Sequence, residues 1–172
     1  MKKGRMTMTV QIENIQSKVE IPQSLMELLE KSVELCILKE SIEVPWEINI
    51  YIVDNDSIAE LNKQHRNIDA ATDVLSFPLI NAENGALMAE SSDINPETGG
   101  LMLGEIVISA EKAVSQAEEL GHSLEREFVF LVTHGVYHTL GFDHLTETES
   151  ELMIRKQEAV LNEMNLHRNK LC

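Results

Sequence analysis

The sequence predicts a single α+β domain with four strands and about five helices. Four short segments rich in β-branched or aromatic residues have the alternation or the apolar content of strands. The longer segments carry apolar residues at helical spacing, and most of them begin at a residue type that caps helices. Strands and helices do not alternate regularly, which favours an α+β over a doubly wound fold. We therefore interpret residues 1–172 as one domain.

Four strands are expected, at residues 7–15, 46–53, 74–79 and 101–108. The second strand, WEINIYIV, is the clearest because polar and apolar residues alternate along it. Pro78 cannot donate a ladder hydrogen bond, so the third strand is expected at an edge or is expected to end there.

The expected helices cover residues 22–40, 56–64 and 110–120, a segment from residue 123 to the glycine at 141, and residues 146–165. Asp56, Ser109 and Ser123 are the expected N-caps of three of them. Thr146 and Glu149 have the spacing of a capping box for the last helix.

Residues 81–100 separate the third and fourth strands. They are polar, acidic and rich in turn residues, so they are expected to form a long exposed loop. Long loops in compact domains are often functional or mobile.

The charge of the chain limits its partners. The formal net charge is −15, which argues against broad electrostatic binding to nucleic acid or to an anionic membrane. Residues 67–111 contain no lysine or arginine, so a polyanionic substrate must be met by a local basic patch. The apolar stretches are too short to span a bilayer.

Cysteine usage and the N-terminus indicate the compartment. The chain has two cysteines, Cys36 and Cys172, which makes a disulfide framework improbable. The basic start MKKGRMTMTV has no apolar run behind it, as a secretory signal would have. A reducing cytoplasm is therefore expected, with Cys36 in the core.

The stretch THGVYHTLGFDH brings three of the six histidines together. On a helix, His134 and His138 leave the same face one turn apart. A straight helix would place His144 roughly 15 Å from His134, too far to share an ion with it. Gly141 can end the helix through a left-handed φ and turn the chain back, so the spacing predicts a metal site made by these three histidines.

Three protein ligands leave one position of a tetrahedral zinc ion open, as in catalytic rather than structural sites. The metzincin peptidases share this histidine spacing, but their general base is a glutamate directly after the first histidine. That position is Gly135 here, which weakens a peptidase reading. A base from elsewhere in the fold would keep that reading open.

The motif HGxxHxxGxDH, filled from His134 to His144, resembles the signature of the YbeY family of bacterial endoribonucleases. Two further blocks resemble the family in matching order, LNKQHRNIDAATDVLSFP at residues 61–78 and LGEIVIS at residues 103–109. Among the departures, Glu105 stands where the family has an aspartate.

The resemblance implies an α+β fold with helices packed on a four-stranded sheet, which we expect to be mixed. It implies a metal-dependent, single-strand-specific endoribonuclease that acts in maturation of the 3′ end of small-subunit rRNA and in ribosome quality control. Its partners would be single-stranded rRNA, the small ribosomal subunit and the assembly proteins of that subunit. By the match, His134, His138 and His144 would hold one Zn²⁺, and Arg66 would be the basic residue facing the site.

The residues themselves support that chemistry. A guanidinium such as that of Arg66 matches the charge that gathers on a phosphate in its transition state. The alternatives are a metallopeptidase-like hydrolase and a non-catalytic ribosome assembly factor with structural zinc. His134 and Arg66 are the expected catalytic residues.

Other candidates in the matched blocks stay open. Asp143 can orient a ligand imidazole or cap the turn after the helix. Asp73 is expected to make strand-end hydrogen bonds. His65 and His122 are interpreted as surface histidines.

Overall fold

The computed structural model describes residues 8–168; Thr7 of the first expected strand and Cys172 lie outside them. The strands are β1 (Met8–Asn14), β2 (Trp46–Val53), β3 (Val74–Pro78), β4 (Asn81–Glu83), β5 (Ala86–Met88) and β6 (Leu101–Ser109). The helices are α1 (Gln23–Lys39), α2 (Asn55–Arg66), α3 (Ala110–Leu120), α4 (Leu124–Thr139) and α5 (Glu147–Glu163), with a short 3-10 turn, η1 (Ser91–Asp93). This composition confirms the α+β prediction.

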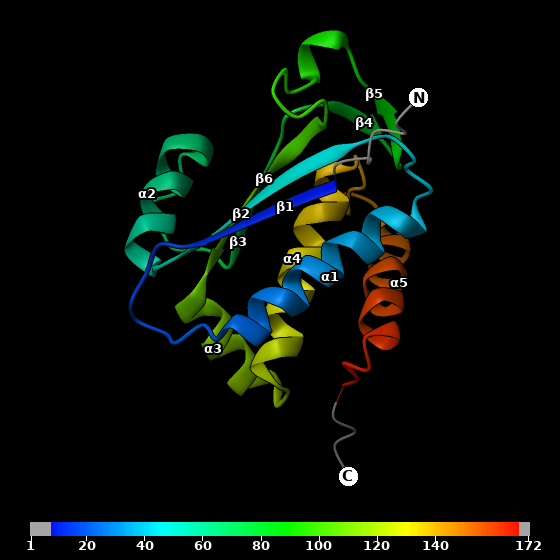
Figure 1. Ribbon diagram of the computed structural model, residues 1–172. Coiled ribbons are helices and arrows are strands. Elements are labelled where there is room, and N and C mark those ends of the chain that lie inside the picture. Colours follow the sequence, from blue (N-terminus) through cyan, green and yellow to red (C-terminus); the bar gives the residue numbers. More distant parts are fainter. Residues whose placement is uncertain (1–7, 169–172) are drawn as a thin grey trace.

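Four strands form the main sheet, in the order β1-β2-β6-β3. β1, β2 and β6 are parallel, and β3 runs antiparallel to β6 at one edge. The sheet is therefore mixed, and β3, which ends at Pro78, is an edge strand as expected (Figure 1). No helix of the described residues is long and apolar enough to cross a membrane.

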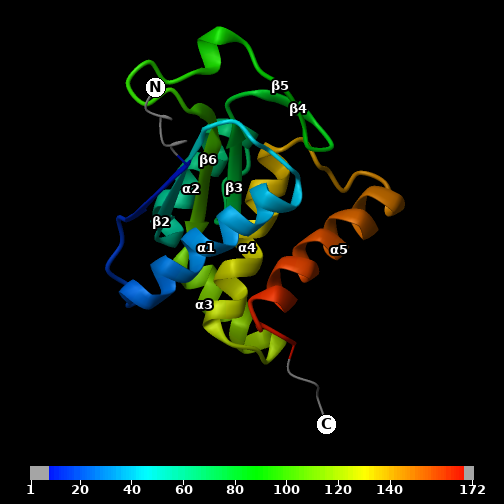
Figure 2. The same cartoon turned by 45° about the vertical axis from the view of Figure 1, so that its right-hand side comes forward.

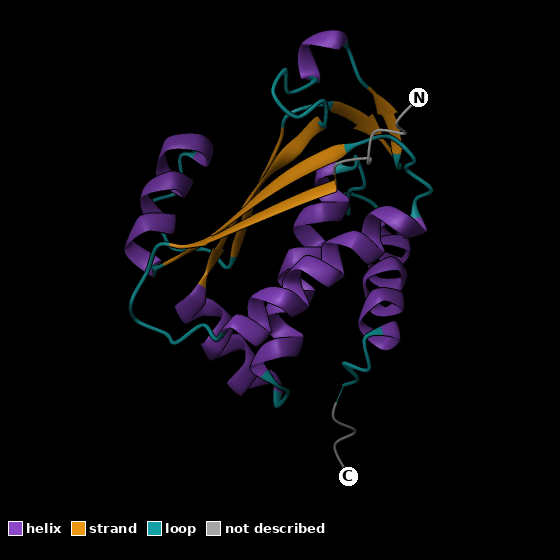
Figure 3. Ribbon diagram, viewed as in Figure 1, coloured by secondary structure: helices purple, strands orange, loops and turns teal. Residues whose placement is uncertain are grey.

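Helices cover the two faces of the sheet unequally. α1 and α4 pack on one face, α5 and α3 pack against α4, and α2 lies on the other face (Figures 2 and 3). The main core lies on the face covered by α1 and α4. The inward residues of β2 on this face are at most 1% exposed: Trp46, Ile48, Ile50 and Ile52. A smaller core beneath α2 contains Val53, Ile58, Leu75 and Val107. Since α2 is short, part of its face of the sheet stays uncovered.

The helix α2 begins earlier than the sequence indicated. Asp54, not Asp56, is its N-cap, and the Asp54 carboxylate accepts a hydrogen bond of 2.9 Å from the amide of Ser57. β2 ends at Val53, directly before Asp54. The chain therefore enters the helix at once, whereas an N-cap at Asp56 would need two more residues between the strand and the helix. The helix also runs further, to Arg66, and ends at Asn67 in a left-handed conformation with φ 57°.

The other predicted caps are confirmed. The Ser109 and Ser123 side chains each accept a hydrogen bond of 3.1 Å, at the start of α3 and α4 respectively. Thr146 and Glu149 form both hydrogen bonds of the capping box at the start of α5.

The segment 81–100 is not only a loop. β4 and β5 form an antiparallel hairpin closed by Asn84 and Gly85, both with positive φ. An Asn-Gly pair is the preferred two-residue hairpin turn, so residues 84–85 carry the local sequence signal for this hairpin. The hairpin packs on the turn after α4, because the amides of Asn84 and Gly85 donate to the carbonyls of Gly141 and Leu140, at 3.2 and 2.9 Å.

Candidate metal centre

The helix α4 places the first two histidines. Its apolar residues are buried against the sheet and the neighbouring helices, and this packing fixes how the helix is rotated. His134 and His138 lie one turn apart on the same side of the helix, and both are partly buried. Their Nε2 atoms are 3.1 Å apart.

The turn after α4 returns the third histidine. Gly141 has φ +84°, and its amide donates to the carbonyl of His138 at 3.1 Å. The chain then reverses, so that the rings of His144 and His138 have centroids 5.0 Å apart. The predicted glycine turn is confirmed.

One of the two readings of Asp143 now has direct support. The Asp143 carboxylate accepts a hydrogen bond of 2.8 Å from the backbone amide of His144, so it caps the turn. It stabilises the loop that carries the third histidine.

The three imidazoles form a site that could hold one metal ion. Their ligand nitrogen atoms all lie within 4.8 Å of one another. Zinc–nitrogen bonds of about 2.0–2.1 Å put two nitrogens of one ion roughly 3.4 Å apart, and the His134–His138 pair already has nearly this spacing. His144 is exposed and can adjust most easily.

The surroundings favour neutral imidazoles, the form that binds metal ions. Burial, followed by the charges of His138 and His144, lowers the pKa of His134 to about 4. Burial, followed by the charge of His144, lowers the pKa of His138, and Arg66 lowers it further.

Two groups that sequence reasoning missed act on the ligand rings. The Gln157 side chain, from α5, raises the pKa of His134, and the backbone of Phe142 raises that of His138, each against the larger effect of burial. Gln157 is 1% exposed, and its amide nitrogen also donates to the Phe130 carbonyl at 3.4 Å. Only the position of a polar residue on the inner face of α5 could have indicated this role.

Replacing Gln157 by leucine is expected to lower the affinity for Zn²⁺ about ten- to hundred-fold, because the His134 ring loses the partner that orients it. Gln157→Glu keeps an acceptor and should restore most of the affinity. Competition against a chromophoric chelator measures both variants. Equal affinities of wild type and Gln157→Leu would show that this contact does not act on the site.

The histidines line an open cleft of about 810 Å³ at the β3 edge of the sheet. The end of α2, strand β3 and the turn after α4 form its walls. Arg66, the last residue of α2, lines the cleft, is exposed, and makes no ion pair with any residue in 8–168. The structure therefore brings Arg66 to the same cleft as the three histidines.

Asp73 also lines the cleft but lies outside the histidine cluster. Its carboxylate accepts hydrogen bonds from the amide of Val74 at 2.8 Å and from the Gln116 side chain at 3.0 Å. These are the strand-end bonds expected from the sequence, together with a link to α3.

The interpretation of His122 as a surface residue was wrong. Its side chain is 9% exposed, and its Nε2 lies 3.0 Å from a carboxylate oxygen of Glu127. Burial, followed by the charge of Asp73, raises the pKa of Glu127 to about 7. A carboxyl group on the inner side of α4 needs a polar partner, and His122 supplies it. His65 is exposed, as expected.

Gly141 lies where no side chain fits. A Cβ there would overlap the backbone carbonyl of Ala82 in β4, and the φ is also left-handed. We expect Gly141→Ala to destabilise the fold by about 1–3 kcal/mol more than the matched variant Gly121→Ala. Gly121 has φ +67°, but a Cβ there meets nothing within 4 Å.

Urea unfolding of the two glycine variants measures the difference. Equal losses of stability would mean that the hairpin moves aside easily. The hairpin would then not fix the turn that carries His144.

Three imidazoles gathered in an open cleft of an α+β domain define the chain as a candidate metalloenzyme. The sequence profile described as Endoribonuclease YbeY matches residues 11–165. The chain belongs to this endoribonuclease family, which confirms the resemblance seen in the three sequence blocks.

Individual relatives agree over nearly the whole length. A protein of Acetivibrio thermocellus named Endoribonuclease YbeY is 47% identical over 162 residues, covering 94% of this chain and 100% of its own. One from Alkaliphilus metalliredigens with the same name is 44% identical and covers 95% of this chain and 99% of its own. A solution structure of a Thermotoga maritima protein has a TM-score of 0.56 at 28% identity, covering 91% of this chain and 92% of the other.

Proposed function

We propose that this protein is a zinc-dependent endoribonuclease that cleaves single-stranded RNA. We infer that it acts in maturation of the 3′ end of small-subunit rRNA and in ribosome quality control in the cytoplasm. The observation that carries the proposal is the cleft in which His134, His138 and His144 lie together with Arg66, which has no ion pair among residues 8–168.

Zinc fits the donor set. Nitrogen ligands are typical of zinc sites, and three protein ligands leave room for a further one. Within residues 8–168 the ligand cluster consists of imidazoles alone, without the oxygen ligands that magnesium and calcium prefer. A zinc ion held there supplies a Lewis acid that withdraws charge from a phosphoryl oxygen.

The residues of the chain complete the chemistry. His134 acts as a ligand whose ring is oriented by Gln157. Arg66 supplies a fixed positive charge and a forked set of donors to the phosphate whose bond is cleaved. Because Arg66 is not held by a carboxylate within residues 8–168, its guanidinium is free to bind phosphate oxygens.

The overall charge supports recruitment through protein partners. With a net charge of −15, electrostatic attraction to RNA is confined to the neighbourhood of Arg66 and the metal. We infer that proteins of the small ribosomal subunit or its assembly factors bring the enzyme to its RNA.

The packing of α4 argues against the peptidase alternative. A Cβ at Gly135 would lie 2.8 Å from a methyl carbon of Ile106 in β6, so the helix and the sheet touch here. The glutamate that peptidases carry at this position would point into the sheet, away from the cleft. The openness of the cleft argues against a purely structural metal.

Cleavage of a 5′-labelled single-stranded RNA, compared with the same RNA in a duplex, tests the proposal. The purified protein should cleave the single strand with zinc bound and spare the duplex. Arg66→Ala, purified in the same way from the same expression host, controls for contaminating nucleases. Equal cleavage of both RNAs would contradict single-strand specificity, and no cleavage at all would contradict the activity.

A further inference from the structure

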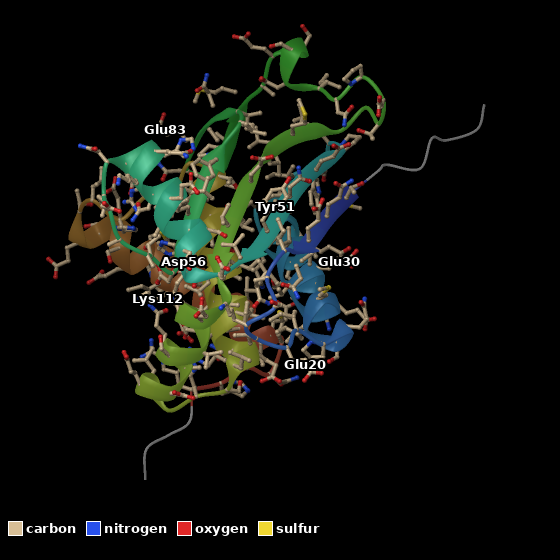
Figure 4. The ribbon with its side chains drawn as sticks, turned by 90° about the vertical axis from the view of Figure 1, so that its left-hand side faces the viewer. Glu20, Glu30, Tyr51, Asp56, Glu83 and Lys112 are labelled. Carbon is tan, nitrogen blue, oxygen red and sulfur yellow. The ribbon has the colours of Figure 1, made fainter. Side chains whose placement is uncertain are left out.

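A second groove, of about 440 Å³, lies on the face of the sheet that carries α2. Tyr51 of β2 together with Glu105 and Val107 of β6 line it from the sheet, and His65 of α2 and Phe77 of β3 also line it. Figure 4 looks onto this face and shows Tyr51 on the sheet beside α2. Glu105 gives this largely apolar and aromatic groove a negative charge.

The groove exists because α2 covers only part of the sheet. Leu75 and Val107, which are register partners, belong to the small core that α2 covers. The next pair along the strands on this face, Phe77 and Glu105, is only partly buried. The aromatic and carboxylate side chains therefore remain accessible from solvent.

The side-chain carboxylate of Glu105 has no hydrogen bond or ion pair with any residue in 8–168, although Glu105 is partly buried. Its charge acts on the neighbouring phenol, because burial, followed by Glu105 and Glu13, raises the pKa of Tyr51. A carboxylate can only accept hydrogen bonds, so a ligand that covers this one must supply donors in place of water. The groove is thus suited to a flat ligand that carries hydrogen-bond donors.

The groove adjoins the metal cleft. His65 and Phe77 line both, and their rings meet edge to face with centroids 4.8 Å apart. A polymer that passes over the β3 edge at these rings can therefore occupy the cleft and the groove together.

We propose that the groove binds one guanine base of the RNA whose scissile phosphate lies in the metal cleft, an inference that rests on the proposed function. Single-stranded RNA is recognised by stacking of its bases on aromatic rings and by hydrogen bonds to their Watson–Crick edges. Tyr51 and Phe77 supply the aromatic surfaces, and Glu105 accepts hydrogen bonds from the N1–H and N2–H groups of guanine.

The carboxylate selects among the bases. Guanine is the only one of the four that presents two adjacent donors on its Watson–Crick edge. Adenine, cytosine and uracil each place an acceptor next to their donor, which a carboxylate repels. The same charge excludes a phosphate from the groove, so the backbone must stay on the cleft side.

The test uses oligouridylates that carry one guanosine, inosine or adenosine at a fixed position. Inosine keeps the N1–H group and lacks the N2 amino group. We expect cleavage at a constant distance from guanosine, with kcat/KM roughly ten- to hundred-fold lower for the adenosine RNA and an intermediate value for inosine.

Two variants distinguish the hydrogen bonds between Glu105 and guanine from the effect of negative charge on this face of the sheet. Glu105→Gln should lose the preference for guanosine, because one acceptor of the pair becomes a donor. Glu13→Gln is the matched control: Glu13 is exposed, belongs to β1 opposite Tyr51, and does not line the groove. It removes the same charge from the same face and should keep the full preference.

The outcomes distinguish this inference from the proposed function. Equal cleavage of all three RNAs by wild type, or equal selectivity in the two glutamate variants, would overturn the guanine site and leave the nuclease intact. If no RNA is cleaved, the proposed function fails. The affinities of the uncleaved RNAs for the protein then test the groove separately, and equal affinities for the three RNAs would overturn the guanine site. In another outcome, wild type shows no preference for guanosine, and a lysine-rich peptide binds to wild type but not to Glu105→Gln. This result would assign the groove to a protein segment and overturn the inference.

Discussion

Replacing His138 by alanine is expected to remove the metal ion and to abolish RNA cleavage. His138 lies close to both other ligands, with its Nε2 3.1 Å from that of His134 and its ring centroid 5.0 Å from that of His144. Two remaining imidazoles would hold zinc far more weakly than three. Since metal binding stabilises the folded state, the metal-loaded wild type should also unfold at a higher temperature than the variant.

Elemental analysis of the purified proteins measures this effect. The wild type should contain about one zinc ion per chain, and His138→Ala almost none. His167→Ala is a suitable control because His167 is exposed and lies outside the cleft. Full zinc occupancy in His138→Ala would rule out the three-histidine site.

Replacing Arg66 by alanine should reduce the rate of cleavage about a hundred- to a thousand-fold while leaving the fold and the metal in place. Removal of one donor that acts mainly in the transition state costs about 2.7–4 kcal/mol in comparable sites. Arg66 is exposed and has no ion pair in residues 8–168, so the fold loses little when it is removed. Its charge nevertheless reaches the metal site, because it adds to the effects of burial and His144 that lower the pKa of His138.

Two further variants sharpen the Arg66 experiment. Arg66→Lys should recover only part of the rate, because an ammonium group cannot form the forked pair with phosphate oxygens. Arg155→Ala removes the same charge from α5, outside the cleft, and should behave like wild type. If Arg66→Ala cleaves single-stranded RNA as fast as wild type, phosphate stabilisation by this residue is ruled out.

Local sequence signals predicted much of the fold. The alternation in β2, the capping box at Thr146 and the glycine turn at Gly141 each depend on residues close together in the chain, and the structure has all three. The start of α2 was misplaced by two residues because Asp54 and Asp56 are both good caps. The choice between them depends on where β2 ends.

The parts of the site that sequence reasoning missed depend on tertiary packing. Gln157 reaches His134 from another helix, and the His122 side chain lies against Glu127 on the inner side of α4. The hairpin acts on the metal turn through bonds between residues 84–85 and 140–141, which are far apart in the chain. Periodicity within a helix carries no information about such partners.

We propose that the three histidines hold one metal ion on which RNA cleavage depends. Titration of chelator-stripped wild type with Zn²⁺, with cleavage of a single-stranded RNA measured at each step, tests this claim most directly. The rate should start near zero and rise until about one equivalent is bound, and His138→Ala should stay inactive throughout. Full activity of the stripped protein, or a wild-type rate in His138→Ala, would contradict a metal-dependent cleavage at these histidines.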